Sequence, residues 1–409
     1  MNNTIRQIIQ SNPIIKILGS PTIFVFTLAW MIVLVIVGTL DQANIGLYQA
    51  QQKYFSSPYF FWGFMPIPSG RLVMFIMTIN LSFYFFRPNI LKLSKIGITI
   101  THAGALLLLI GGGLTALSNK EGRMPIEEGR SSDFWEDHYD KELAIINVSN
   151  TEYDEYTTFN QSVLNNGNVI SNNETLPFEV EVQQFYTNCE YRDRDNLSDN
   201  YLGAGKSFYI IQKEPEKEYE QNRACLMFKV KGEDISNNGN YIAYQGPFIA
   251  NLNDQIQGNE EIVQQFITYN GNTFYLDLRN TRTYLPIEIE LIDFKKVMHP
   301  NKNPPEAKSF SSDINLIEDD VSRSVLIKMN EPLRHKGYTF YQASFQDRGG
   351  YTYNDSYYYE TRFFKDRTVL AVVKNYGRLF PYISSIIMCL GILIHLLLRA
   401  NKKKNVSKV

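Results

Sequence analysis

Cysteine is scarce in this chain: the 409 residues include only three, and no two of them form a C-x-x-C pair. The sequence therefore gives no indication of a dithiol oxidoreductase. It also lacks a P-loop, an H-E-x-x-H sequence, a Ser-His-Asp set and a paired-carboxylate motif. We find no catalytic residues in the sequence, which favours a binding or assembly role over a hydrolase.

Acidic residues are almost absent outside one long segment. Of the 42 Asp and Glu, 41 lie in residues 118–378, where 28 Lys and Arg give a formal net charge of −13. Such a surface disfavours nucleic acid and favours basic partners, unless it serves solubility alone. The remaining residues contain four apolar runs, at 21–40, 72–86, 96–117 and 379–398.

These runs predict membrane helices, because a helix needs about 20 apolar residues to cross the hydrocarbon core. The first, third and fourth runs are long enough. The second is short and contains Asn80, but the apolar stretch FFWGFMPIP precedes it, and we interpret it as a span with an interfacial lead-in. The first run is too long for a signal peptide and no small-residue cleavage site follows it, which favours a retained helix.

Lysine and arginine set the expected orientation. They occur without any acid in the N-terminal segment, the loop between the second and third runs, and the C-terminal tail. We therefore predict a cytoplasmic segment 1–20, a three-helix membrane region 21–117 with outer loop 41–71 and inner loop 87–95, an extracytoplasmic domain 118–378, a fourth helix 379–398 and a basic cytoplasmic tail 399–409. Both termini are then cytoplasmic, in a multi-pass protein.

The extracytoplasmic segment has mostly period-two patterns, rich in Tyr, Phe, Val and Ile, which predict strands. Examples are 177–185, 207–212, 225–232, 273–280, 286–294 and 324–330. Asn-Gly pairs that favour tight turns begin at Asn166, Asn238 and Asn270. The predicted fold is thus a membrane protein with four transmembrane α-helices and a large all-β domain between helices 3 and 4.

Two further features of this domain leave alternatives open. LPFEVEVQQF begins at Leu176 and LPIEIELIDF at Leu285, which indicates either two related β units or two ordinary amphipathic strands. Cys189 and Cys225 lie where a disulfide is chemically permitted, but their spacing does not show whether they pair.

Two histidines lie within the apolar runs, and ionisable residues at bilayer depth are usually functional. His102 lies roughly 9 Å along the third run, and His395 roughly 5 to 6 Å from the end of the fourth. A neutral imidazole there could bind haem iron, whose flat macrocycle suits a glycine-lined wall, or simply pack helices. The nearby small residues are Gly104, Gly111, Gly112 and Gly113. For His102 we favour the role of haem ligand. For His395, which can snorkel to the interface, we favour the structural role.

The other three histidines, His138, His299 and His335, lie in the predicted extracytoplasmic domain. They are not spaced in the sequence as metal ligands usually are.

The chain resembles the ResB-like proteins of cytochrome c biogenesis, the System II pathway. The resemblance runs through IVLVIVGTLDQANIGLYQAQQKYFSSPYFFW, GRLVMFIMTINLSFYFF, KIGITITHAGALLLLIGGGLTAL and PIEIELIDF. The most specific stretch is PIEIELIDF, followed by SFSSDINLIED and VLIKMNEPLRHKGYTFYQASF. The tryptophan-rich WWD motif of the family's partner protein is missing, so the chain resembles the stand-alone ResB half.

This resemblance implies a role in the bacterial cytoplasmic membrane, beside a ResC (CcsA)-type partner. Together the two would move haem outward and present it with apocytochrome c for thioether attachment. The implied cofactor is haem b, bound transiently and non-covalently. His102 matches the family's membrane histidine and would be an axial ligand of the haem iron, with a second ligand from the partner. His395 matches no such position and stays a candidate cofactor-binding residue from depth alone.

Two other functions remain open. A membrane-anchored binding or scaffold module without haem would use His102 only to pack helices. A proton-conducting transporter is least favoured, because the spans lack acidic partners and inverted repeats.

Overall fold

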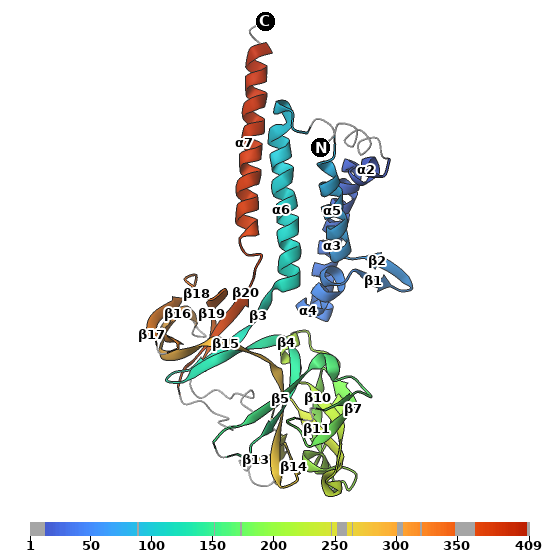
Figure 1. The fold of residues 1–409 in the computed structure, drawn as a ribbon, viewed down its shortest axis with the longest axis vertical. Helices are drawn as coiled ribbons and strands as arrows, with labels where there is room; N and C mark the ends of the chain where they lie inside the picture. Colours follow the sequence, from blue (N-terminus) through green and yellow to red (C-terminus); the bar gives the residue numbers. More distant parts are fainter. Residues whose placement is uncertain are drawn as a thin grey trace. The chain divides into compact units, whose positions relative to one another are not determined.

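The computed structural model describes residues 13–87, 90–150, 152–171, 174–246, 248–251, 260–263, 265–300, 306–319, 321–347 and 365–406 (Figure 1). Residues 1–12 and 407–409, parts of the predicted cytoplasmic ends, lie outside the described residues. The chain divides into two compact units. The helical unit comprises Met1–Lys120 and Lys374–Val409, and the β unit comprises Glu121–Val373.

In the described chain, three helices are long and apolar enough to cross a membrane. They are α3 (Pro21–Ile45), the segment Leu93–Ser118 that includes α6 (Ile96–Ser118), and Phe380–Ala400 of α7 (Phe380–Val406). The predicted second span contains only α5 (Gly70–Tyr84), whose 15 residues extend about 22 Å. The apolar helices indicate membrane association, and the count of four spans stays a prediction.

The stretch before α5 does not lengthen that helix. It forms an antiparallel hairpin of β1 (Tyr59–Trp62) and β2 (Met65–Pro68), in which Pro66 and Pro68 disfavour a helix interior. Before the hairpin, α4 (Leu47–Gln51) and a π-helical turn (Gln52–Ser56) fold back along α3. The hydroxyl of Tyr54 and the ammonium of Lys53 both donate to Oδ2 of Asp41, at 2.8 and 2.9 Å.

Asn80 closes a break between α2 (Pro13–Leu18) and α3. Its buried Nδ2 donates to the carbonyl oxygens of Leu18 and Ser20. The guanidinium of Arg87 donates to Gly19 O at the same break. The polar residue of the predicted second span therefore satisfies backbone groups that α2 and α3 leave free where they end and begin.

The helices α6 and α7 pack antiparallel along a seam of small residues. Gly97 and Gly104 on α6 recur every seven residues with Gly111, opposite Gly391, Ser384 and Gly377. A Cβ added to Gly97 would lie 2.7 Å from Cα of His395, and one added to Gly104 would lie 2.6 Å from Cγ of Met388. Small residues at helical repeats let two membrane helices approach this closely.

In its described residues the β unit has two larger sheets and two two-stranded sheets, β8-β9 and β12-β13. The first main core lies between the two larger sheets, and the second belongs to the larger of them. One sheet has the order β11-β10-β7-β6, and the larger has β17-β16-β15-β4-β3-β20-β19-β18, with β14 beside β15 and β5 beside β4. The strands of the β unit before residue 200 are β3 (Lys120–Glu127), β4 (Ser131–Asn147), β5 (Glu155–Asn160), β6 (Val169–Ile170), β7 (Phe178–Tyr186) and β8 (Cys189–Asp193). The later strands are β9 (Phe208–Gln212), β10 (Cys225–Gly232), β11 (Gly239–Tyr244), β12 (Phe248–Asn251), β13 (Glu260–Val263), β14 (Phe266–Tyr269), β15 (Asn272–Met298), β16 (Ala307–Glu318), β17 (Val321–Lys328), β18 (Leu333–His335), β19 (Tyr338–Gln346) and β20 (Arg367–Lys374).

The predicted strands are confirmed, with one correction. The segments 273–280 and 286–294 belong to a single strand, β15, rather than to two. Its first half buries Phe274 and Leu276 in one core, and its second half buries Ile287 and Ile289 in the other. Of the Asn-Gly pairs, Asn270-Gly271 makes the tight hairpin between β14 and β15, with both residues at positive φ.

The repeated sequence pattern occupies equivalent positions in the two cores. Leu176, Phe178, Val180 and Val182 are buried in the first core, which contains β7. The matching Leu285, Ile287, Ile289 and Leu291 are buried in the second core. The alternation therefore gives the same inward face twice, once in each of two different sheets.

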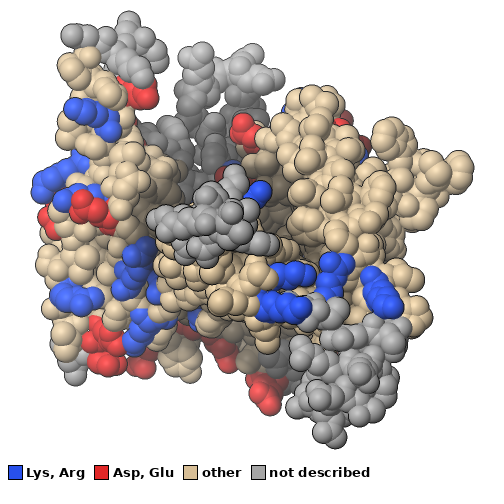
Figure 2. All heavy atoms as spheres, turned by 90° about the horizontal axis from the view of Figure 1, so that it is seen from above, with Lys and Arg blue, Asp and Glu red and all other residues tan. Residues whose placement is uncertain are grey.

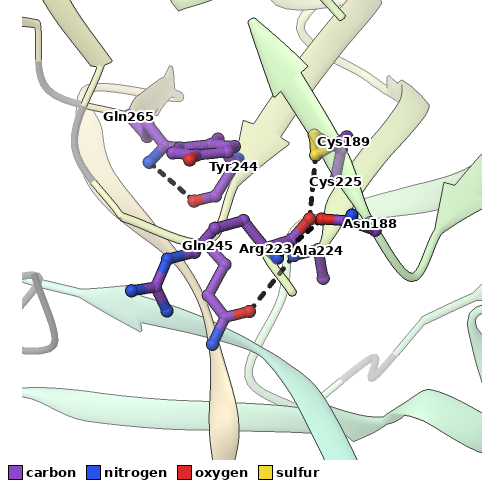
Figure 3. Close-up of a disulfide and its surroundings, with 8 residues drawn as sticks. All are labelled: Asn188, Cys189, Arg223, Ala224, Cys225, Tyr244, Gln245 and Gln265. Carbon is purple, nitrogen blue, oxygen red and sulfur yellow. Dashed lines mark hydrogen bonds between the residues drawn. A yellow bond between two sulfur atoms is a disulfide. The ribbon is translucent and has the colours of Figure 1, made fainter. Parts of the chain in front are cut away.

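The structure pairs Cys189 with Cys225 in a disulfide, with Cα atoms 6.1 Å apart (Figure 3). It joins the first residues of β8 and β10, where Figure 3 shows Asn188, Arg223 and Gln245 close by. Asn188 Oδ1 accepts a hydrogen bond from the backbone N–H of Arg223, and Gln245 Oε1 accepts one from the backbone N–H of Ala224. The disulfide thus lies where β10 meets its neighbouring loops.

Replacing both of these cysteines with alanine should lower the thermal unfolding midpoint of the β unit. The bond closes a loop with a sequence separation of 36, for which chain entropy predicts a loss on the order of 4 kcal/mol. Circular dichroism of the full chain in detergent would measure the strand signal on heating. Cys389→Ala is the matched control, because Cys389 is free and exposed. Equal midpoints for all three proteins would show that the bond adds no stability.

Candidate functional site

His102 lies in α6, and its surroundings define which ring nitrogen is free. Its Nδ1 is 2.8 Å from the carbonyl oxygen of Ile98, one turn earlier. A carbonyl only accepts hydrogen bonds, so Nδ1 must carry the proton. The neutral ring then has an unprotonated Nε2, the form that binds a metal ion. A hydrogen bond from the other ring nitrogen to a carbonyl commonly fixes the tautomer of metal-binding histidines.

The ring of His102 also stacks on Tyr84, at the end of α5. The ring centroids are 4.2 Å apart and the planes differ by 14°. The guanidinium of Arg87 lies 5.9 Å from the centroid of the Tyr84 ring. His102 itself stays only half-buried. Tyr84 therefore fixes the plane of the imidazole, while part of the ring remains accessible.

The glycines near His102 divide into two pairs with different surroundings. Gly104 and Gly111 are buried against Met388 and Phe380 of α7. Gly112 and Gly113 have open space where a side chain would start, with no described atom within 4 Å. The seam with α7 therefore leaves no room for a flat ligand, and the open wall lies along Gly112 and Gly113.

His395 occupies a different face of the helix pair. Its backbone lies directly opposite Gly97 on the α6–α7 seam. Gly97 precedes His102 by five residues, or about 7.5 Å along α6. No described contact joins the two histidines. The structure therefore places them near the same end of the helical unit without bringing their rings together.

Basic residues gather at this same end. Residues 16, 87, 92, 95 and 399 belong to the end of α2, the segment after α5, the turn before α6 and the late part of α7. Figure 2 shows a group of Lys and Arg side chains on the face seen from above. At this end of the helical unit, the guanidinium of Arg87 donates a hydrogen bond to Gly19 O, so the fold fixes the position of this positive charge.

The other histidines have local roles in the β unit. His335 Nε2 lies 2.8 Å from Glu318 Oε2, beside Arg323 in a hollow of about 300 Å³. His138 is 3.8 Å from Glu220, and the backbone N–H of His299 bonds Glu306 O. No group of three or more His, Cys, Asp or Glu side chains in the described residues could hold a metal ion.

A cluster of buried charged side chains lies where β4 pairs with β15. Arg279 bonds Glu142 and Asp277 at 2.9 and 3.1 Å, with all three side chains about 5 % exposed. Lys141 donates to Asn280 Oδ1 beside them. Burial, reinforced by Arg223 and Arg123, lowers the pKa of Lys141 to about 8. The fold therefore bears the cost of a desolvated ammonium at neutral pH.

The stability of the β unit should rise between about pH 8 and 10.5 through Lys141. Unfolded, this lysine keeps its proton up to its ordinary pKa of 10.5, whereas the folded chain releases it near 8. The unfolded state thus binds more protons in this window, which increases the free energy of unfolding, on the order of 3 kcal/mol at most. Denaturant titrations of the full chain should show the rise in wild type but not in Lys141→Met. The half-exposed Lys231→Met is the control and should keep it.

Sequence reasoning missed two features of the helical unit. Nothing in the spacing marks Tyr84 as a partner of His102, because the pair depends on how α5 packs against α6. A hollow of about 370 Å³, lined by residues that include Gly38, Gln42 and Phe55, lies between α3 and the π-helical turn. Asp41, the one acid outside residues 118–378, is a signal that could have marked this region. Neither described hollow includes His102 or His395.

Comparison with known proteins agrees with the resemblance found in the sequence. Residues 254–362 match the model of the ResB-like family. The matched range begins before β15 and continues past β19, so it includes most of the second core but not its residues in β3, β4 and β20. No curated protein matches the chain.

Proposed function

We propose that this ResB-like protein is a cytochrome c assembly factor that works with a ResC (CcsA)-type membrane partner. The family implies a role in cytochrome c biogenesis. In this role the two proteins move haem across the membrane and support its attachment to apocytochrome c. The chain would supply binding and orientation, and its sequence has no evident catalytic residues.

One observation carries the haem assignment: the Nδ1 of His102 is held by Ile98, which leaves Nε2 free on a half-buried ring. Imidazole is a common axial ligand of haem iron. Gly112 and Gly113 leave α6 open away from α7, but they lie about 15 Å beyond His102 along the helix and do not line its ring. Because no described hollow includes His102, we propose half a site, with the second ligand and the remaining wall supplied by the partner.

His395 is a second candidate for contact with haem, with a weaker basis. It lies near the same end of the helices as His102 but on the seam with α6. We propose that its ring extends toward the inner surface of the membrane and meets haem only as haem enters. Its loss should therefore reduce loading less than the loss of His102.

The proposed orientation puts both termini inside and the β unit outside. The basic end of the helices supports it by the positive-inside rule. The disulfide between Cys189 and Cys225 supports it too, because such bonds persist in oxidising compartments. With four spans, α5 together with α4 and the π-helical turn would form the second crossing. The extracytoplasmic segment 118–378, with its formal net charge of −13, would dock the partner or a basic apocytochrome.

The alternative is an anchored binding or scaffold module without haem. The contacts of His102 with Ile98 and Tyr84 favour it, because they also describe a ring that only packs helices. The neighbouring genes discriminate: a ResC-like reading frame or cytochrome c genes favour assembly.

Deleting the gene in its host tests the proposed role. We expect the c-type cytochromes to lose covalently bound haem, as seen by haem staining of denaturing gels, while b-type haem spectra persist. Wild-type protein should restore the staining. Normal c-type cytochromes in the deletion strain would exclude a role in their assembly.

A further inference from the structure

The hairpin between α4 and α5 exposes apolar side chains without any charge. No Asp, Glu, Lys or Arg occurs between Lys53 and Arg71. Five of its large side chains are half or more exposed, and Phe64 at the tip is 90 % exposed. The exposed members are Tyr59, Phe61, Trp62, Phe64 and Met65. A surface of this kind usually marks a contact with lipid or protein.

The hairpin is fixed to the helices and does not hang from a loose loop. The indole of Trp30 in α3 donates to Pro68 O at 2.9 Å. The backbone N–H of Ser69 bonds Pro58 O across the base of the hairpin. Phe60 packs edge-on against the buried Tyr54, with centroids 4.8 Å apart. The helices therefore set the level at which the exposed rings project.

That level is the end of α6 opposite to the basic residues. Tyr84 stacks on His102, and Met77 shares a core with Leu109. This antiparallel register puts Gly70, where α5 begins, level with the last turn of α6. The apolar run of α3 continues for ten residues past Trp30. The base of the hairpin therefore lies beside the apolar run of α3 and level with the last turn of α6.

The backbone of the hairpin argues against both the hydrocarbon centre and an added strand. Its sheet has two strands, so both outer edges lack a strand neighbour among the described residues. Open edges do not occur in the hydrocarbon core, but water reaches the headgroup region. Pro66 and Pro68 remove two donors from β2, which prevents strand addition by another protein on that edge. Tyr and Trp are enriched at membrane interfaces.

We propose that residues 59–68 are an interfacial anchor that lies among the lipid headgroups and the upper acyl chains, in the leaflet at the C-terminal end of α6. The anchor would hold α3 and α5 at a fixed depth, since α5 alone is too short to span the membrane. The ligand is the phospholipid surface itself. The inference depends on membrane association and not on haem.

Trp62 is a built-in probe for this test. The full chain and Trp62→Phe would be reconstituted in phosphatidylcholine vesicles whose acyl chains carry bromine close to the headgroup or near the chain end. The difference between the two proteins isolates Trp62, while Trp30 and Trp135 remain in both. We expect the Trp62 emission to be quenched more strongly by the shallow bromines than by the deep ones.

Two results would overturn the proposal. Quenching of Trp62 by aqueous iodide but by neither bromolipid would put the hairpin in water, free for a protein partner. Stronger quenching by the deep bromines would put it in the hydrocarbon centre. Because the purified chain has no partner present, lipid is the available apolar contact, and Trp62→Phe keeps an aromatic ring that should not disturb folding.

Discussion

His102→Ala is expected to reduce the haem that co-purifies with the chain and its partner by more than about tenfold. Loss of a residue that only hydrogen-bonds a metal ligand typically lowers metal affinity by about 10- to 100-fold, and loss of the ligand itself should lower it at least as much. The optical spectrum of the purified complex, with haem normalised to protein, measures the loss. Added imidazole should restore part of the signal, since it can occupy the space that the ring leaves.

A second substitution separates ligation from packing. His102→Phe keeps a flat ring that can stack on Tyr84 but has no nitrogen to bind iron. We expect it to lose haem as completely as His102→Ala, whereas His395→Ala should retain most of it. If His102→Phe keeps wild-type haem, then the ring packs helices and the ligand assignment is wrong.

Gly97→Ala is expected to separate α6 from α7 and to lower the yield and thermal stability of the protein. The new Cβ would collide with the backbone of His395 and lie 2.7 Å from Gly391 O. Backbone atoms cannot turn aside as a side chain can, so the helices must move apart. Overpacking typically costs 1 to 3 kcal/mol, and about that much or more is expected here.

Gly112→Ala is the matched control in the same helix. Nothing described lies within 4 Å of its added Cβ, and alanine favours a helix over glycine by about 1 kcal/mol. Its unfolding midpoint in detergent should equal or exceed that of wild type. Equal losses in the two variants would mean that the loss does not come from a close approach at Gly97, and the close seam would be refuted.

The sequence predicted local structure better than pairing. Alternating residues in 177–185 and 225–232 are typical of strands with one buried face, and β7 and β10 occupy those segments. The same alternation cannot show that 273–280 and 286–294 are continuous. The register of β15 against β4 shifts between Tyr284 and Ile289, so the strand bends between two cores without ending. The Cys189–Cys225 pair likewise depends on how the strands are arranged, which spacing does not reveal.

The candidate site shows the same division. The depth of His102 was visible as an ionisable residue in an apolar run, but its partners were not. Ile98 is its partner because residues four apart share a helix face, which the sequence could have suggested. Tyr84 depends on the packing of α5, and the role of Gly104 and Gly111 depends on α7. Four similar glycines thus have two different environments.

The most direct measurement of the central claim is a ligand exchange at residue 102. The complex with the partner would be purified in wild-type form and as His102→Cys, and electron paramagnetic resonance spectra of the ferric haem would be compared. Thiolate and imidazole give iron different electronic properties, so we predict that the spectrum changes to that of a thiolate-ligated haem. An unchanged spectrum at full haem content would show that the iron is held elsewhere, and the proposed role of His102 would fall.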